Sequence, residues 1–136
     1  MKILLADDDS KIHLIVQLWL RRNGHDVVSV YNGRDALAKL REGYFDGLIT
    51  DVNMPLLKGV DLVKKTLLLP FVPKMIVILT SRCDLTQLKQ DLDDPRVHIF
   101  SKPFSPSALM ELIESLSRKA RTDNECDKEK SFTHPA

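Results

Sequence analysis

Short apolar runs alternate with longer segments of helical periodicity along most of the chain. Each run is too short for a helix and is followed by polar or turn-forming residues, which is the pattern of a buried β-strand. The predicted strands are Ile3–Ala6, Val27–Tyr31, Gly47–Thr50, Met75–Leu79 and Val97–Phe100.

Between and after these runs, apolar residues recur every three or four positions, as they do on one face of a helix. The first helix is marked by Ile12, Ile15, Val16 and Trp19, which we predict to face the core. Asp9 and Ser10 are candidate caps at its start, as Ser105 and Pro106 are for the last helix. The later stripes are Ala36, Leu37 and Leu40; Val60, Leu62, Val63 and Leu67; Leu85, Leu88 and Leu92; and Leu109, Leu112, Ile113 and Leu116.

Five strand–helix units in strict alternation predict an α/β fold with five helices flanking a five-stranded parallel sheet. Right-handed crossovers make this sheet doubly wound, with helices on both faces. Asn32 and Gly33 are predicted to form the turn that ends the second strand. We predict one domain over residues 1–119 and a disordered tail over 120–136, where Phe132 is the only large apolar residue.

The composition adds exclusions. The 136 residues are 43% hydrophobic and 29% charged, which is typical of one globular domain without room for an effector domain. A net charge of +1 argues against direct nucleic-acid binding. No apolar stretch is long enough to insert into a membrane, and residues 1–7 lack a signal-peptide pattern. With Cys83 and Cys126 interpreted as reduced thiols, we expect a cytoplasmic protein.

Polar residues of particular types follow the predicted strands. Asp7, Asp8 and Asp9 follow the first strand, Asp51 the third, Thr80 and Ser81 the fourth, and Lys102 comes just after the fifth. Because the carboxyl ends of parallel strands meet at one edge of a sheet, we expect these side chains to converge there. The four histidines are scattered and are interpreted as surface or internally satisfied residues.

Such a cluster of carboxylates needs a positive charge among them to stay ionised. An oxygen-only ligand set suits a hard cation such as Mg²⁺. Lys102 and the Thr80 hydroxyl would complement an anionic, oxygen-rich group, for which a phosphoryl group fits. Asp51 is the candidate nucleophile because it stands alone at the end of the central strand.

These residues resemble the receiver domain of two-component response regulators, of the CheY-like superfamily, over roughly residues 1–119. The matching segments are Ile3–Asp9, Ile49–Pro55 with Gly59, Ile78–Ser81 and Ser101–Phe104. The segments occur in the family's order, each at a predicted strand end. The resemblance implies a stand-alone receiver with the flavodoxin-like strand order 2-1-3-4-5.

The resemblance also implies a role for each residue. Asp51 would be the phosphoacceptor, Thr80 the switch hydroxyl and Lys102 the lysine that pairs with the phosphoryl group, before a cis bond to Pro103. The implied ligands of Mg²⁺ (or Mn²⁺) are Asp7 through a bound water, Asp8, Asp51 and the backbone carbonyl of Asn53. Gly59 matches the residue that opens the turn after Met54 and Pro55.

The sequence departs from the family at two places. Ile99 stands where an aromatic residue usually forms the second half of the switch, and Phe100 is predicted to point to the opposite face of the sheet. The segment Asp91–Arg96 replaces a Gly-Ala turn with Asp93, Asp94 and Pro95. We therefore expect intact phosphorylation chemistry with an unusual readout. Arg82, two residues after Thr80, is expected to modify the lifetime of the acyl phosphate.

Three functions compete at this point. The first is a phosphoacceptor signalling module that takes a phosphoryl group from a histidine kinase or a histidine phosphotransfer protein and switches binding of an unknown output protein. Beyond its own phosphorylation and dephosphorylation it would not be an enzyme. The second is a receiver-like docking domain that does not switch, and the third is a haloacid-dehalogenase-like phosphatase attacking through Asp7. A homodimer is compatible with all three.

Overall fold

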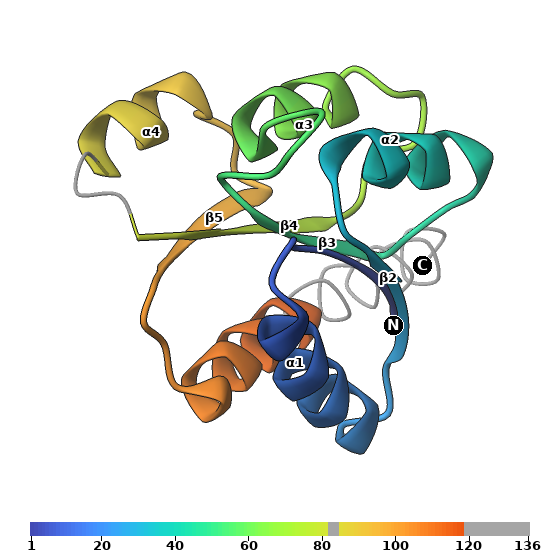
Figure 1. Cartoon of the computed structure of the whole chain (residues 1–136), viewed down its shortest axis with the longest axis vertical. Coiled ribbons are helices and arrows are strands. Elements are labelled where there is room, and N and C mark those ends of the chain that lie inside the picture. The colour runs from blue at the N-terminus through green and yellow to red at the C-terminus, as the bar shows by residue number, and fades with distance from the viewer. Residues whose placement is uncertain (82–84, 119–136) are drawn as a thin grey trace, which may run out of the picture.

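The computed structural model describes residues 1–81 and 85–118. It contains one parallel sheet of five strands in the order β2-β1-β3-β4-β5, so the predicted strand order is confirmed (Figure 1). The strands are β1 (Lys2–Ala6), β2 (Asp26–Val30), β3 (Gly47–Asp51), β4 (Met75–Thr80) and β5 (Val97–Ser101). The helices are α1 (Ser10–Arg22), α2 (Gly33–Glu42), α3 (Gly59–Thr66), α4 (Leu85–Asp91) and a C-terminal helix over residues 106–118.

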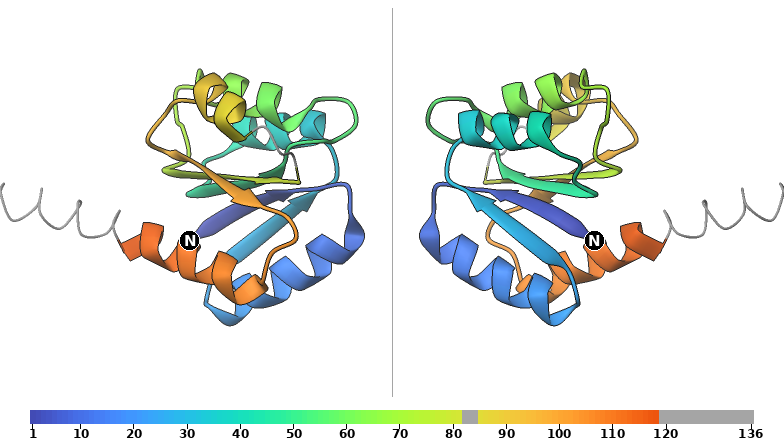
Figure 2. Two further views of the ribbon diagram at one scale, coloured as in Figure 1. Left: turned by 90° about the vertical axis from the view of Figure 1, so that its left-hand side faces the viewer. Right: turned by 90° about the vertical axis from the view of Figure 1, so that its right-hand side faces the viewer.

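Two helical layers cover the sheet. Helices α2, α3 and α4 lie on one face, and α1 and the C-terminal helix lie on the other (Figures 1 and 2). The core has two clusters accordingly, with Leu4 and Leu48 facing the first layer and Leu5 and Ile49 facing the second. Strands β3 and β4 are buried along their whole length, which explains their continuous apolar sequences.

Helices α1 and α2 each have an N-cap residue whose side chain accepts a backbone hydrogen bond. Asp9 is the N-cap of α1, where its carboxylate accepts a hydrogen bond from the Lys11 amide at 2.9 Å, as predicted. Asn32 is the N-cap of α2 and accepts from the Asp35 amide at 2.8 Å. The prediction of a simple turn at Asn32 and Gly33 was therefore wrong in part, because Gly33 is already the first residue of α2.

The buried face of α1 differs from the predicted stripe. His13, Val16 and Leu20 are buried, whereas Ile15 is 42% exposed and Trp19 packs only partly buried at the margin of the core. Both sets have helical spacing, and α1 is rotated so that His13 replaces Ile15 on the inner face. The prediction of Ile15 as a core residue was therefore wrong.

The described helices include none that is both long and apolar enough to cross a membrane. The expected tail over 120–136, the proposed effect of Arg82 and the thiols of Cys83 and Cys126 all concern residues outside the described part.

Ile99 and Phe100 of β5 point to opposite faces of the sheet, as predicted. Ile99 packs on the cluster beneath α2, α3 and α4, while Phe100 packs on the opposite cluster, with its ring 5.8 Å from that of Phe104. Before β5, Asp94 closes the turn by accepting hydrogen bonds from the amide and the guanidinium of Arg96, at 2.8–2.9 Å. These bonds hold the turn between α4 and β5.

The pair between Asp94 and Arg96 gives a pH-dependent prediction. Hydrogen bonds from Arg96 lower the pKa of Asp94 from 3.8 to about 2. The pair therefore contributes stability that is complete above the unfolded pKa of 3.8 and lost as the pH falls through 2. Since the pair is partly exposed and screened by solvent, we expect Asp94→Asn to lower the free energy of unfolding by about 1 kcal/mol near neutral pH.

Urea unfolding of both proteins, from neutrality down to the lowest pH at which they remain folded, measures this difference. The neighbouring exposed carboxylate offers a matched control, Asp93→Asn, which should change stability little. A loss in Asp94→Asn that stays constant as the pH falls would contradict the assignment.

Candidate functional site

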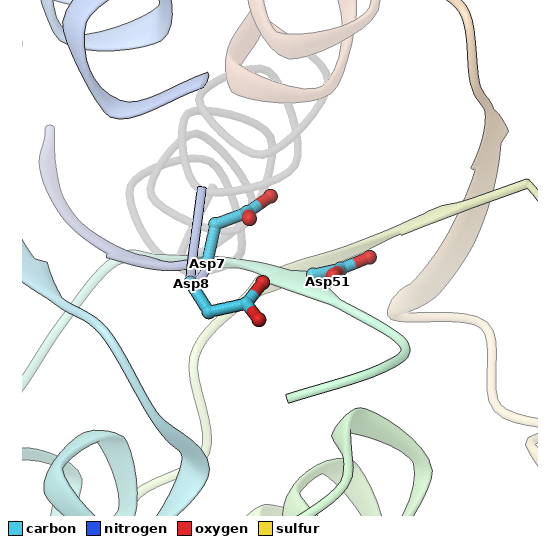
Figure 3. Close-up of side chains that lie close together, drawn as sticks. All are labelled: Asp7, Asp8 and Asp51. Carbon is cyan, nitrogen blue, oxygen red and sulfur yellow. The ribbon is translucent and has the colours of Figure 1, made fainter. Parts of the chain in front are cut away.

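Three aspartates meet at the carboxyl edge of the sheet. Asp7 and Asp8 follow β1, and Asp51 is the last residue of β3, the neighbouring strand. One carboxylate oxygen from each lies within 4.8 Å of the others (Figure 3). Asp7 is fully buried and Asp51 is 8% exposed, whereas Asp8 is exposed at the rim. The structure therefore brings these three predicted site residues together.

Lys102 joins this cluster from the loop after β5. Its Nζ lies 3.2 Å from Oδ1 of Asp51 and 3.4 Å from Oδ2 of Asp7. Its amide donates to the carbonyl of Thr80 at 2.7 Å, and the bond to Pro103 is cis, as expected. One ammonium thus bridges carboxylates from two strands.

Burial and charge shift the pKa values of this cluster in a consistent way. Burial is the main cause that raises the pKa of Asp7, and the negative charge of Asp51 raises it further. The Asp9 amide and Lys102 lower this pKa, but their effects are outweighed. For Lys102, burial is the largest single effect and lowers the pKa, but the charges of Asp7 and Asp51 and the hydrogen bonds to them together outweigh it, so the pKa rises. Lys102 is therefore held as a cation, and an ionised Asp7 carries an electrostatic cost.

Backbone amides hold the two buried carboxylates in place. Oδ1 of Asp7 accepts a hydrogen bond from the Asp9 amide at 2.9 Å, and Oδ1 of Asp51 accepts from the Val52 amide at 2.9 Å. The donors belong to the turns that follow the two strands, so these turns orient the carboxylates before any ligand binds.

The remaining predicted residues also lie at this edge. Thr80 is fully buried at the end of β4, in register with Ser101 of β5. Asn53 is exposed two residues after Asp51 and lines a shallow depression with Asp8 and Lys58. The structure therefore places Thr80 and Asn53 at the same edge of the sheet as the three aspartates and Lys102.

Gly59 permits the close approach of α3 to the end of β3. A Cβ atom at this position would overlap the carbonyl oxygen of Asp51 and lie 2.8 Å from the Cα of Val52. Both neighbours are backbone atoms, so neither can move aside like a flexible side chain. The Gly59 amide donates to the carbonyl of Val52 at 2.9 Å, which fixes the contact.

The donor chemistry of this cluster fits a hard divalent cation. Three carboxylates supply oxygen ligands, and two of them are buried. Repulsion between negative charges is stronger in the protein interior than in water. Mg²⁺ and Mn²⁺ favour such oxygen ligands, and Mg²⁺ usually keeps several bound waters. Asp8 is exposed, so the side of the cluster at Asp8 is open to water. No nitrogen or sulfur ligand belongs to this described group, which disfavours a zinc site.

Sequence reasoning missed two residues near the cluster. Lys58 adds a cation beside the depression, and its position before α3 gave no periodic signal. His13 is 2% exposed, and its Nε2 lies 2.6 Å from the carbonyl oxygen of Asp7. The alternative stripe of His13, Val16 and Leu20 at helical spacing was the available signal for its burial.

Comparison with known proteins identifies the family. A model of the response regulator receiver domain matches residues 3–114. The response regulator receiver protein CpdR of Brucella abortus is 30% identical over 116 residues, covering 85% of this chain and 95% of that protein. The transcriptional regulatory protein ResD of Bacillus subtilis is 27% identical over 119 residues, covering 88% of this chain. The chain spans about half the length of ResD and of several other such regulators.

Solved structures agree with this assignment. The chemotaxis response regulator CheY4 of Vibrio cholerae is 31% identical with a TM-score of 0.75, covering 85% of this chain and 97% of that one. The receiver domain of the Francisella response regulator 1452 is 25% identical with a TM-score of 0.75, covering 88% and 98% respectively.

The electrostatic cost of Asp7 leads to a stability prediction. Because its pKa is raised in the folded protein, the native state favours protonated Asp7, and ionisation of Asp7 destabilises the fold at neutral pH. Without divalent cations, we expect Asp7→Asn to raise the free energy of unfolding by about 1 kcal/mol near neutral pH. The gain should shrink as the pH falls through the raised pKa. Urea unfolding at several pH values measures it.

Asp8→Asn is the control for that experiment, because the Asp8 side chain is exposed to solvent. A stability in Asp7→Asn equal to or below that of the unchanged protein would contradict the interpretation.

The contact at Gly59 predicts a sharp difference between two glycines. Gly59→Ala should lower the free energy of unfolding by about 3 kcal/mol, because the new methyl group forces the backbone of Asp51 to shift. Gly43→Ala is the matched control, since a Cβ atom at that position would meet nothing within 4 Å and the backbone there is extended. Denaturant unfolding of both variants tests this, and equal stabilities would show that the loop after β3 yields easily.

Proposed function

The chain belongs to the response regulator receiver domain family, and we propose that it is a phosphoacceptor signalling module that is phosphorylated on Asp51. Receiver domains are signalling modules of two-component systems that interact with histidine kinases. The observation that supports the proposal is the convergence of Asp7, Asp8 and Asp51 with Lys102 at one sheet edge. A purely structural domain has no use for carboxylates that repel one another.

In the proposed reaction, Asp51 is the nucleophile. Its Oδ1 already accepts hydrogen bonds from Val52 and Lys102, so Oδ2 is the oxygen whose lone pairs are open to attack phosphorus. An oxygen–phosphorus bond forms as the phosphorus–nitrogen bond of a phosphohistidine breaks. The imidazole takes up one proton and leaves as a neutral group, and the product is an aspartyl phosphate.

The other residues act on charge. Lys102, held protonated, would move from Asp51 and Asp7 towards the phosphoryl oxygens. The hydroxyl of Thr80, at the end of the adjacent strand, is the proposed hydrogen-bond donor that responds to phosphorylation. Asp7, Asp8, Asp51 and the carbonyl of Asn53 would hold Mg²⁺ or Mn²⁺. The cation, when bound, neutralises charge on the phosphoryl group.

A groove beside the cluster supports a protein phosphodonor rather than only a small molecule. It lies between α1 and the loop after β5, and its lining includes Asp9, Lys102, Ile12, Ile15 and Phe104. Leu14 and Leu18 add exposed apolar area on α1. We propose that a histidine kinase or histidine phosphotransfer protein docks here, in the cytoplasm, which brings its phosphohistidine to Asp51.

Ile99 favours a second candidate, a receiver-like docking domain that does not switch. Its side chain is partly buried against the core beneath α4, where an aromatic switch residue would rotate in other receivers. The two candidates differ in whether Asp51 accepts a phosphoryl group.

The test is intact-mass spectrometry after incubation with a small acyl phosphate, with and without Mg²⁺. We expect the unchanged protein to gain the mass of one phosphoryl group only when Mg²⁺ is present. Asp51→Asn should gain none, while Asp61→Asn, an exposed aspartate of α3, should behave like the unchanged protein.

Two other outcomes would favour a different function. Failure of the unchanged protein to form an adduct while it binds Mg²⁺ would favour the docking domain. An adduct that persists in Asp51→Asn but disappears in Asp7→Asn would favour attack by Asp7, as in haloacid-dehalogenase-like phosphatases.

A further inference from the structure

The side chain of His13, on α1, contacts the backbone of Asp7 in the acidic cluster. Its Nε2 lies 2.6 Å from the carbonyl oxygen of Asp7, the oxygen of the peptide that joins Asp7 to Asp8. A carbonyl oxygen only accepts hydrogen bonds, so Nε2 must carry the proton and donate. The histidine is therefore bonded to the peptide between two proposed ligands of the cation.

The environment of the ring argues against a purely space-filling role. His13 is 2% exposed, and the Tyr31 ring lies over it with the centroids 4.3 Å apart. Its Nδ1 is buried and has no hydrogen-bond partner among the described residues. An apolar residue would fill this space without leaving a buried acceptor unpaired, which costs stability. The bond to Asp7 is what a leucine in this position could not supply.

Asp7 is held at each of its polar groups by a different element. Its amide donates to the Val30 carbonyl of β2 at 3.3 Å, and its carboxylate accepts from the Asp9 amide and Lys102. His13 holds the remaining group, the carbonyl, from α1. Without this bond the peptide after Asp7 could rotate, and the direction of the Asp8 side chain would change with it.

We infer that His13 is a positioning residue that orients the peptide between Asp7 and Asp8 for binding of a divalent cation. The inference rests on the proposed function, since it concerns the same acidic cluster. His13 touches neither the cation nor the phosphoryl group in this role; it acts through the Asp7 carbonyl. Partners of this kind around metal ligands typically contribute about tenfold or more to metal affinity.

Calorimetric titration with Mg²⁺ alone tests the inference. His13→Leu removes the donor while keeping an apolar side chain of similar reach, and we expect it to weaken Mg²⁺ binding about tenfold. His13→Gln places an amide N–H at nearly the position of Nε2, so it should recover most of the affinity. Val16→Ala, at a buried position of the same helix, should lower the melting temperature and leave the affinity unchanged.

The control separates positioning from stability. If His13→Leu binds Mg²⁺ as tightly as the unchanged protein, the inference is wrong. The same holds if Val16→Ala loses as much affinity as His13→Leu, or if His13→Gln fails to recover any.

A second measurement needs no metal and no variant. The nitrogen chemical shifts of the His13 ring in the cation-free protein should show a proton on Nε2, the nitrogen that faces the Asp7 carbonyl. The opposite tautomer would overturn the inference even if His13→Leu did not fold. If the unchanged protein binds no Mg²⁺ and forms no adduct, the proposed function fails, and this measurement still decides whether His13 donates to Asp7.

Discussion

The repulsion among Asp7, Asp8 and Asp51 is the constraint on which the rest of this structure depends. Three carboxylates with oxygens within 4.8 Å of one another cannot stay ionised without compensation, and two of the three are withdrawn from solvent. Lys102 provides one positive charge against the three negative ones. The metal-free site is therefore negative overall, and an anionic phosphodonor would be repelled by it. This repulsion is the physical argument for the proposed binding of a divalent cation.

The backbone holds the carboxylates of this cluster close to one another. Strands β1 and β3 are adjacent and buried, which places Asp7 and Asp51 at neighbouring ends. The amides of Asp9 and Val52 and the close approach of Gly59 then restrict the turns that follow. The apolar core stabilises the sheet, and the sheet offsets the unfavourable electrostatics at its edge. The acidic cluster thus lowers the stability of the fold, as functional sites often do.

The fold and the site differ in how much of each the sequence could predict. Continuous apolar strands and right-handed crossovers determine the sheet, and polar residues at strand ends must then converge. The face of α1 was not predictable in the same way, because apolar residues occur almost all around that helix, including the exposed Leu14 and Leu18. Periodicity could not choose between Ile15 and His13 for the inner face. Tertiary contacts accompany the choice: Val16 and Leu20 pack in the core, and His13 on the same face meets the Asp7 carbonyl, which only the folded chain places nearby.

Strand β5 links the site to the question of output. Ile99 and Phe100 face opposite layers, so the aromatic ring of β5 packs with Phe104 beside the loop that carries Lys102, and not beneath α4. A branched aliphatic side chain has few rotamers and makes no hydrogen bond, so Ile99 could not follow the proposed response of the Thr80 hydroxyl by rotating. Movement of Lys102 towards a phosphoryl group would instead act on Pro103 and Phe104, next to the groove along α1. If Asp51 is phosphorylated as proposed, the packing of β5 would therefore couple this chemistry more directly to the α1 face of the sheet than to the α4 face.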